Sequence, residues 1–176
     1  MTAYLLTMPS GFPGSLTRQE HATVEGQPIN TTSPPQTYGQ VVVMDVATGT
    51  IRQPTTTDTT GFWGISVRPY PTQGFGPAGS AALSSPVGAV TPPTAGAVDV
   101  MRRGYILCQL GGATAAVKGA PVNVWTGATG AGQVTGNVTA VAPAAGSCVA
   151  LPGAVFMSVQ DPGPLSQGLV EVAFNI

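Results

Sequence analysis

The sequence predicts an all-β fold, a single-domain β-sandwich or barrel with an extended N-terminal arm, and its composition supplies the main reasons. The 176 residues include 21 Val and 22 Thr, whose branched side chains pack well on a pleated sheet. Straight-chain helix formers are scarce, with 9 Leu, 3 Glu and 1 Lys. The 24 Gly and 17 Pro supply turns between short Val-rich runs. Strand-like runs repeated at short, turn-marked intervals are typical of sandwiches and barrels.

Residues 1–38 are predicted to form the arm. They carry large apolar side chains early in the chain, but Pro and Gly interrupt any regular period. Because a free arm of this kind would be poorly solvated, we expect it to lie on its own domain or on a neighbouring subunit by strand addition. A frayed tail is the alternative.

The β domain is predicted over residues 39–176, with no internal boundary. Alternating apolar residues predict its first strands, and Ala47-Thr48-Gly49-Thr50 predicts a hairpin turn between two of them. Gly104 lies where a bulge or bend would fit in a long strand. The expected strands are 41–46, 51–53, 61–68, 98–110, 121–125, 133–141, 147–151, 154–159 and 169–174.

Residues 69–97 are predicted to be a long Pro/Gly-rich loop. They contain six Pro and no charged residue, which disfavours a helix or a central strand. Loops of this length are uncommon in compact domains unless they are mobile or have a function. The loop is therefore a second candidate for contact with a partner, and an excursion along the protein's own surface is the alternative.

The low charge of the chain restricts its partners. Six Lys or Arg and seven Asp or Glu give a formal net charge of -1. Attraction to nucleic acid or to anionic membranes is therefore negligible, and much of the exterior is expected to be interface. A soluble extracellular β-sandwich with a Thr-, Ser- and Asn-rich surface is the alternative.

The sequence also bears on the cellular compartment. It has no signal-peptide pattern and no run of about 18 apolar residues, so synthesis and retention in a cytoplasm are expected. Cys108 and Cys148 are expected to be buried thiols in that compartment.

Catalytic and ligand-binding motifs are not recognisable, so the chain is predicted to be no enzyme and to bind no cofactor or metal. The single His21 lies in the irregular arm, far from a rigid scaffold for a triad. The acidic residues and the two cysteines lack the spacing of a metal site. The Gly-rich stretches 111–112 and 127–136 match neither the phosphate-loop nor the dinucleotide pattern.

Four blocks of residues resemble the structural cement proteins of tailed bacteriophages. They are Met8–Gly14 followed by Thr17-Arg18, Val67–Gln73, Asp99–Tyr105 and the ending Val170–Ile176. The resemblance implies a jelly-roll-like β-sandwich that binds the outer surface of a phage head and clamps adjacent capsomers. It also implies that the partners are the major capsid protein and a second copy of the chain, in a homodimer or alternatively a trimer. The implied location is the outer capsid surface of a virion made in a bacterial cytoplasm.

These blocks and the arm supply a hypothesis for the interface. Its residues are Tyr4, Leu5, Leu6, Met8, Phe12, Arg18, Arg68, Tyr70, Arg102, Arg103 and Tyr105. One alternative function is a carbohydrate- or host-surface-binding domain of a virion, which predicts a groove with exposed Trp63 or Trp125. A further alternative is a hydrolase whose acidic residues converge only in the fold.

Overall fold

The structure is a computed structural model that describes residues 11–69, 91–130, 132–159 and 168–176. Within these residues the chain forms nine strands and one short 3-10 helix, so the all-β prediction is confirmed. The elements are η1 Gln19–His21, β1 Thr23–Pro28, β2 Val41–Asp45, β3 Thr50–Arg52, β4 Phe62–Ser66, β5 Ala97–Gly111, β6 Pro121–Trp125, β7 Val138–Thr139, β8 Cys148–Phe156 and β9 Leu169–Phe174. Most of the predicted loop, at residues 70–90, lies outside the described part.

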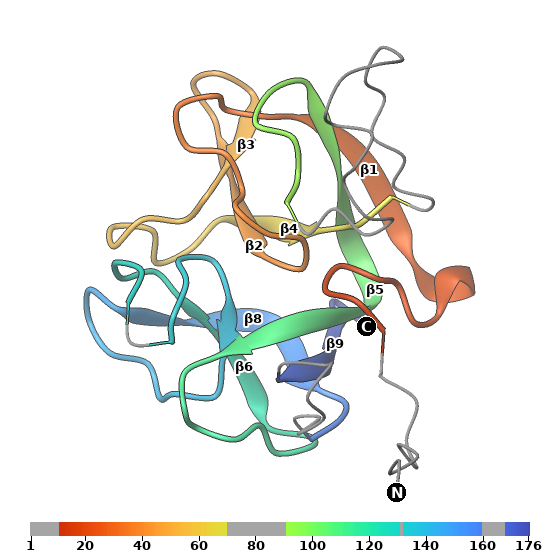
Figure 1. The fold of residues 1–176 in the computed structure, drawn as a ribbon, viewed down its shortest axis with the longest axis vertical. Helices are drawn as coiled ribbons and strands as arrows, with labels where there is room; N and C mark the ends of the chain where they lie inside the picture. Colours follow the sequence, from red (N-terminus) through yellow and green to blue (C-terminus); the bar gives the residue numbers. More distant parts are fainter. Residues whose placement is uncertain (1–10, 70–90, 131, 160–167) are drawn as a thin grey trace, which may run out of the picture.

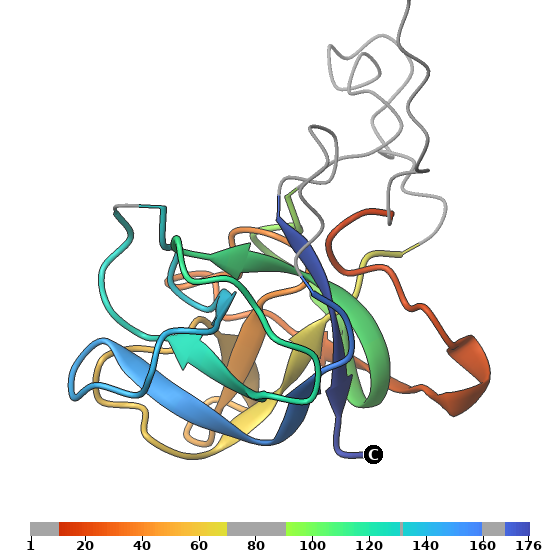
Figure 2. The same cartoon turned by 90° about the horizontal axis from the view of Figure 1, so that it is seen from below.

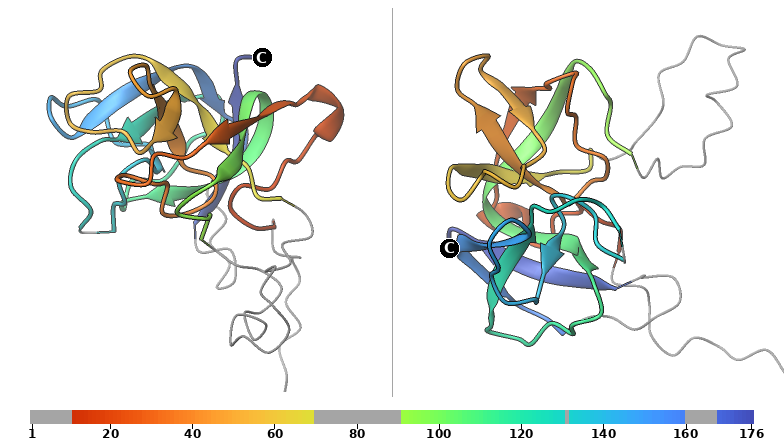
Figure 3. Two further views of the ribbon diagram at one scale, coloured as in Figure 1. Left: turned by 90° about the horizontal axis from the view of Figure 1, so that it is seen from above. Right: turned by 90° about the vertical axis from the view of Figure 1, so that its left-hand side faces the viewer.

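The strands form two rings that share β5, one above the other in Figures 1 and 3. The upper ring runs β1, β5, β4, β2, β3, with antiparallel pairing at each step. It is closed by a parallel bridge between Ile29 and Ile51, where the Asn30 N–H donates to the Ile51 carbonyl at 2.9 Å. This closure leaves most of β1 paired on one side only.

The lower ring runs β5, β9, β8, β6, β7 and returns to β5. The first four steps are antiparallel, and the short β7 pairs in parallel with the end of β5, where Val138 lies opposite Leu110. A closed ring has no free edge along its length. The jelly-roll arrangement is therefore not confirmed, because the pairs form two rings joined by one strand rather than two facing sheets of a double Greek key.

The shared strand β5 changes partners at Gly104, the predicted bend. Residues 97–103 of β5 pair with β1, and 104–109 pair with β9. Gly104 has a φ of 141°, and a Cβ there would lie 3.0 Å from the Ala22 Cα. Only glycine accepts both the backbone angle and the close approach of the chain that crosses it.

Alternate residues of the central strands enter two different cores. A smaller core lies in the upper ring and contains Ile29, Tyr38, Val42, Ile51, Val98 and Val100. A larger core fills the lower ring and also takes Val41, Ile65 and Met101 from the other face of the upper ring. Because both faces of β2 are covered, the run Val41-Val42-Val43 is continuously buried instead of alternating with polar residues.

A buried glutamine joins the rings. Gln40 is 1% exposed, and its side-chain oxygen accepts the backbone N–H groups of Gln36 and Thr37 at 2.8 and 3.1 Å. Its Nε2 donates to the Thr135 carbonyl at 3.0 Å and to Asn137 Oδ1 at 3.2 Å, both ahead of β7 in the lower ring. The rings are thus linked by a satisfied polar network as well as by β5.

Two strand predictions need correction, and one strand was not predicted. The unpredicted strand is β1, at residues 23–28 of the segment predicted as an extended arm, and it pairs with β5 of the same chain. The strand predicted at 133–141 is only two residues long, because a turn occupies its first half, where Asn137 N–H bonds to the Val134 carbonyl. The strands predicted at 147–151 and 154–159 are one continuous strand, β8, since Pro152 and Gly153 lie within it without ending it.

Candidate functional site

The N-terminal segment at residues 11–18, here called the strap, lies along β5 at the waist between the rings (Figure 1). Gly14 N–H donates to the Leu107 carbonyl at 2.7 Å, and Leu107 N–H donates to the Ser15 carbonyl at 2.9 Å. Thr17 N–H donates to the Tyr105 carbonyl at 3.1 Å. Because these bonds use only main-chain atoms, the strap is in effect a short extra strand added to β5.

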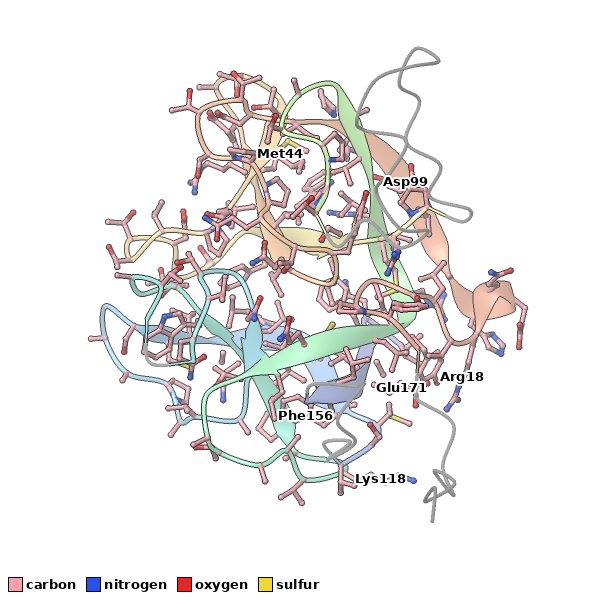
Figure 4. The ribbon with its side chains drawn as sticks, viewed as in Figure 1. Arg18, Met44, Asp99, Lys118, Phe156 and Glu171 are labelled. Carbon is pink, nitrogen blue, oxygen red and sulfur yellow. The ribbon has the colours of Figure 1, made fainter. Side chains whose placement is uncertain are left out.

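The strap ends in a polar cluster at Glu171 of β9. Thr17 Oγ1 donates to Glu171 Oε1 at 2.5 Å, and Arg18 Nε lies 3.7 Å from the same oxygen (Figure 4). The Arg18 guanidinium also lies over the Tyr105 ring, 4.0 Å from its centroid. His21 meets the edge of that ring, with centroids 6.4 Å apart. The cluster ties the strap to the lower ring.

Two other arginines stack on aromatic rings. Arg68 lies 4.6 Å from the centroid of Phe12, whose side chain is 59% exposed. Arg102 lies 3.6 Å from the centroid of Trp63, donates to the Trp63 carbonyl and lies 3.9 Å from a Glu25 carboxylate oxygen. Cation–π stacking of this kind contributes about 0.5–1 kcal/mol at exposed sites.

The structure brings together part of the predicted interface. Phe12 meets Arg68, and Arg18 meets Tyr105. Arg102 is turned toward Trp63, whereas Arg103, the next residue of β5, is exposed on the opposite face. Tyr4, Leu5, Leu6, Met8 and Tyr70 were also predicted there and lie outside the described residues.

Sequence reasoning did not assign three contributors to this surface: Thr17 and Glu171, quoted only within the family blocks, and Trp63, named only for the carbohydrate-binding alternative. Glu171 lies in a block quoted for the family resemblance, but only as part of a terminal strand. Its single charge among apolar neighbours in Val170–Phe174 was the available signal. A lone acid in a buried strand needs partners, and here they are the Thr17 hydroxyl and the Arg18 guanidinium.

The remaining polar groups of the described residues show no reactive arrangement. Arg52 and Asp58 form a two-pronged ion pair at 2.7 and 2.9 Å, which holds the pKa of Asp58 at about 2. Cys108 and Cys148 are buried, unbonded thiols, as expected, and burial raises the pKa of both. No group of three or more His, Cys, Asp or Glu converges within the described residues. None of the helical segments described is long and apolar enough to cross a bilayer.

The chain is similar to known proteins in sequence and in fold. Residues 1–175 match the family model described as structural cement protein (E217 gp24/Pam3 gp6). A chain in the solved structure "The capsid of Myoviridae Phage XM1" has a similar fold, with a TM-score of 0.66 and 18% sequence identity. The match covers 98% of this chain and 95% of that chain. At this identity the likeness concerns the fold. No curated protein matches the sequence.

Proposed function

The chain belongs to the structural cement protein family, and from this premise we propose that it is a non-enzymatic capsid subunit that binds the outside of a phage head and clamps adjacent capsomers. The family match over residues 1–175 carries the proposal. The fold shared with a chain of a phage capsid supports it.

Clamping follows from binding linkage. A protein that binds only the assembled shell stabilises it by about 2.7 kcal/mol per site when its free concentration is a hundredfold above Kd. Many symmetric sites multiply this modest effect. Because such contacts can rest on backbone pairing and apolar packing, the low charge of the chain is compatible with the role.

The proposed capsid-facing surface is the strap side of the molecule, which Figure 2 shows projecting to one side of the body, away from β8. Phe12 of the strap is exposed, and Arg103 of β5 is also exposed and forms no ion pair within the described residues, so we propose both as contact residues. Arg18 and Arg102 each lie near a carboxylate of their own chain, so we assign them to holding their own segments in place rather than to contact with the capsid. Aromatic and arginine side chains are enriched at the centres of interfaces.

The proposed partners are the major capsid protein and a second copy of the chain, in a homodimer or alternatively a trimer. The proposed location is the outer surface of a virion whose parts are synthesised in the bacterial host cytoplasm. Sedimentation of the purified protein distinguishes a dimer from a trimer by mass.

The tryptophans favour this function over carbohydrate binding. Sugar-binding sites use an open aromatic face, but Arg102 covers one face of Trp63. Trp125 is half-buried, and its Nε1 donates to the Ala128 carbonyl at 3.0 Å. Glycan-array binding of the purified protein would support the alternative.

The experiment is to mix purified protein with undecorated heads and to count bound copies by electron cryomicroscopy. We expect lattice-ordered density on the outer surface, at sites that touch two capsomers. Absence of ordered binding contradicts the cement function.

Two pairs of variants locate the surface. Phe12→Ala and Arg103→Ala are expected to weaken head binding about tenfold each. Val46→Ala and Lys118→Ala are the matched controls, because they remove an exposed valine and an exposed cation away from the strap. Lys118 lies at the far end of the lower ring, and Met44, two residues before Val46, lies in the upper ring (Figure 4). Equal losses in test and control variants would place the interface elsewhere.

A further inference from the structure

The strap covers the stretch of β5 at residues 105–107, here called the groove, which cannot be left uncovered without cost in free energy. The groove lies on β5, where Ile106 is fully buried and Leu107 is 5% exposed. Gly11 of the strap lies so close to Leu107 that a Cβ on Gly11 would be 2.8 Å from Leu107 Cδ1. Removing the strap would expose this apolar surface and a row of backbone hydrogen-bonding groups.

The bonds that hold the strap are independent of the chain that supplies it. Three main-chain hydrogen bonds join Gly14, Ser15 and Thr17 to β5, and Leu16 packs against the larger core. Glu171, on a strand at the other end of the sequence, accepts a hydrogen bond from Thr17 and lies near Arg18. The strap of a second copy presents the same atoms and therefore fits the same groove.

The link between the strap and β1 has the properties of a hinge. It consists of η1 and Ala22; η1 contains no buried residue, and no side chain caps its amino end. Its polar contacts are peripheral, such as the exposed Glu20–His21 pair at 3.9 Å. The four residues of the link, 19–22, span up to about 14 Å when fully extended. Opening the link therefore costs little packing beyond the approach of Ala22 to Gly104 and the edge contact of His21 with Tyr105, and it gives the strap considerable reach.

We propose that the strap exchanges between copies: residues 11–18 leave their own β5 and occupy the groove of a neighbouring copy when copies are held close together. The inference rests on the cement function, since a shell would hold copies at high local concentration. The same contacts form within one chain or between two, so proximity and the strain of the link decide which predominates. The occupant of each groove is the strap of a second copy.

Isotope-resolved cross-linking tests the exchange. Thr17→Cys with Glu171→Cys replaces two side chains that touch, and light and 15N-labelled copies of this double variant are mixed before oxidation. We expect disulfides that join light to heavy peptides, both on heads and in concentrated free protein. Cross-links confined to light–light and heavy–heavy peptides in both samples overturn the proposal.

A second cysteine pair controls for random collision. Arg52→Cys with Asp58→Cys replaces an ion pair between residues six positions apart, and its cross-links should stay within one isotope. Mixed-isotope cross-links at equal frequency in this pair would overturn the assignment to strap exchange. Head binding is counted in the same samples. Mixed cross-links in free protein that does not bind heads would therefore support exchange while contradicting the cement function.

Shortening the hinge gives an independent test. Deleting Glu20 and His21 removes most of η1 and shortens the link to two residues, which should strain the strap in its own groove and so favour exchange. The deletion variant is expected to sediment as a stable exchanged oligomer. Adding Leu16→Asp to the deletion should abolish this assembly. A folded monomer whose groove amides remain protected from hydrogen exchange would contradict the proposal.

Discussion

The upper and lower rings contain the same number of strands but differ in how they are closed and filled. The upper ring is closed by one bridge at Ile29 and Ile51 and has a core of six buried hydrophobic residues. The lower ring is closed by strand pairing, and its core of 17 such residues includes four from the upper ring or its edge. The core of the lower ring therefore also buries the outer face of the upper ring. We therefore expect a substitution in the larger core to destabilise both rings, and a substitution in the smaller core to destabilise the upper ring alone.

The largest effect is expected from Phe156→Ala in the larger core. Phe156 is fully buried, and truncation of such a phenylalanine costs about 3–5 kcal/mol of unfolding free energy. Urea denaturation measures the loss, and amide hydrogen exchange should accelerate in both rings. Val46→Ala, at a side chain 91% exposed, is the control and should change stability by less than about 0.5 kcal/mol. Faster exchange in the lower ring alone would show that the rings are not coupled in this way.

Ile51→Ala tests the smaller core in the same way. Ile51 is fully buried and forms the bridge that closes the upper ring. The expected loss is about 2–4 kcal/mol. Faster amide exchange should be confined to β1, β2 and β3. If β8 and β9 exchange faster as well, the two cores form one cooperative unit.

Gln40→Leu should remove the hydrogen-bond network that links the two rings. The substitution leaves several buried donors and acceptors without a partner, so we expect a loss of about 2–3 kcal/mol. Thermal unfolding should then show the upper ring melting before the lower one. Gln36→Leu alters an exposed glutamine close by in the chain and provides the matched control. A single, unshifted transition in Gln40→Leu would mean that β5 and the larger core hold the rings together without the Gln40 network.

The smallest effect is expected at the Arg52–Asp58 pair, at the edge of the upper ring. The pKa of Asp58 is about 2 in the folded chain and near 3.8 ordinarily, so its ionised form stabilises the fold. This contribution is complete above about pH 4 and is lost as the pH falls toward 2. Asp58→Asn should cost about 1–2 kcal/mol at pH 7 and much less at pH 2.5, measured by urea midpoints. Glu20→Gln, at an exposed carboxyl, is the matched control for the loss of one negative charge. A constant penalty at both pH values would assign the Asp58 effect to packing.

The same contrast explains which elements could be predicted from the sequence. β2, β4, β5 and β9 have apolar residues at positions that the fold buries, and local patterns revealed each of them. β1 has five exposed residues of six and exists because it pairs with β5. A strand formed by pairing alone leaves no burial pattern in its own sequence.

The candidate site follows this division too. Phe12, Arg18, Arg68, Arg102 and Tyr105 were predicted individually, from blocks that resemble a family. Which arginine stacks on which ring was not predicted, because each ring and its arginine come from different segments of the chain. Glu171 joins the site from a strand 153 residues after Arg18 in the sequence.

The sequence by itself determined the β class, the places of most strands, the bend at Gly104 and the low charge of the exterior. These properties depend on each residue and its near neighbours: branched side chains favour strands, and a crowded crossing at positive φ requires glycine. The tertiary structure alone decided the closure of two rings on β5, the joint at Gln40 and the seating of the strap. Each joins segments that are distant along the chain, and the choice among possible pairings depends on what the whole core buries.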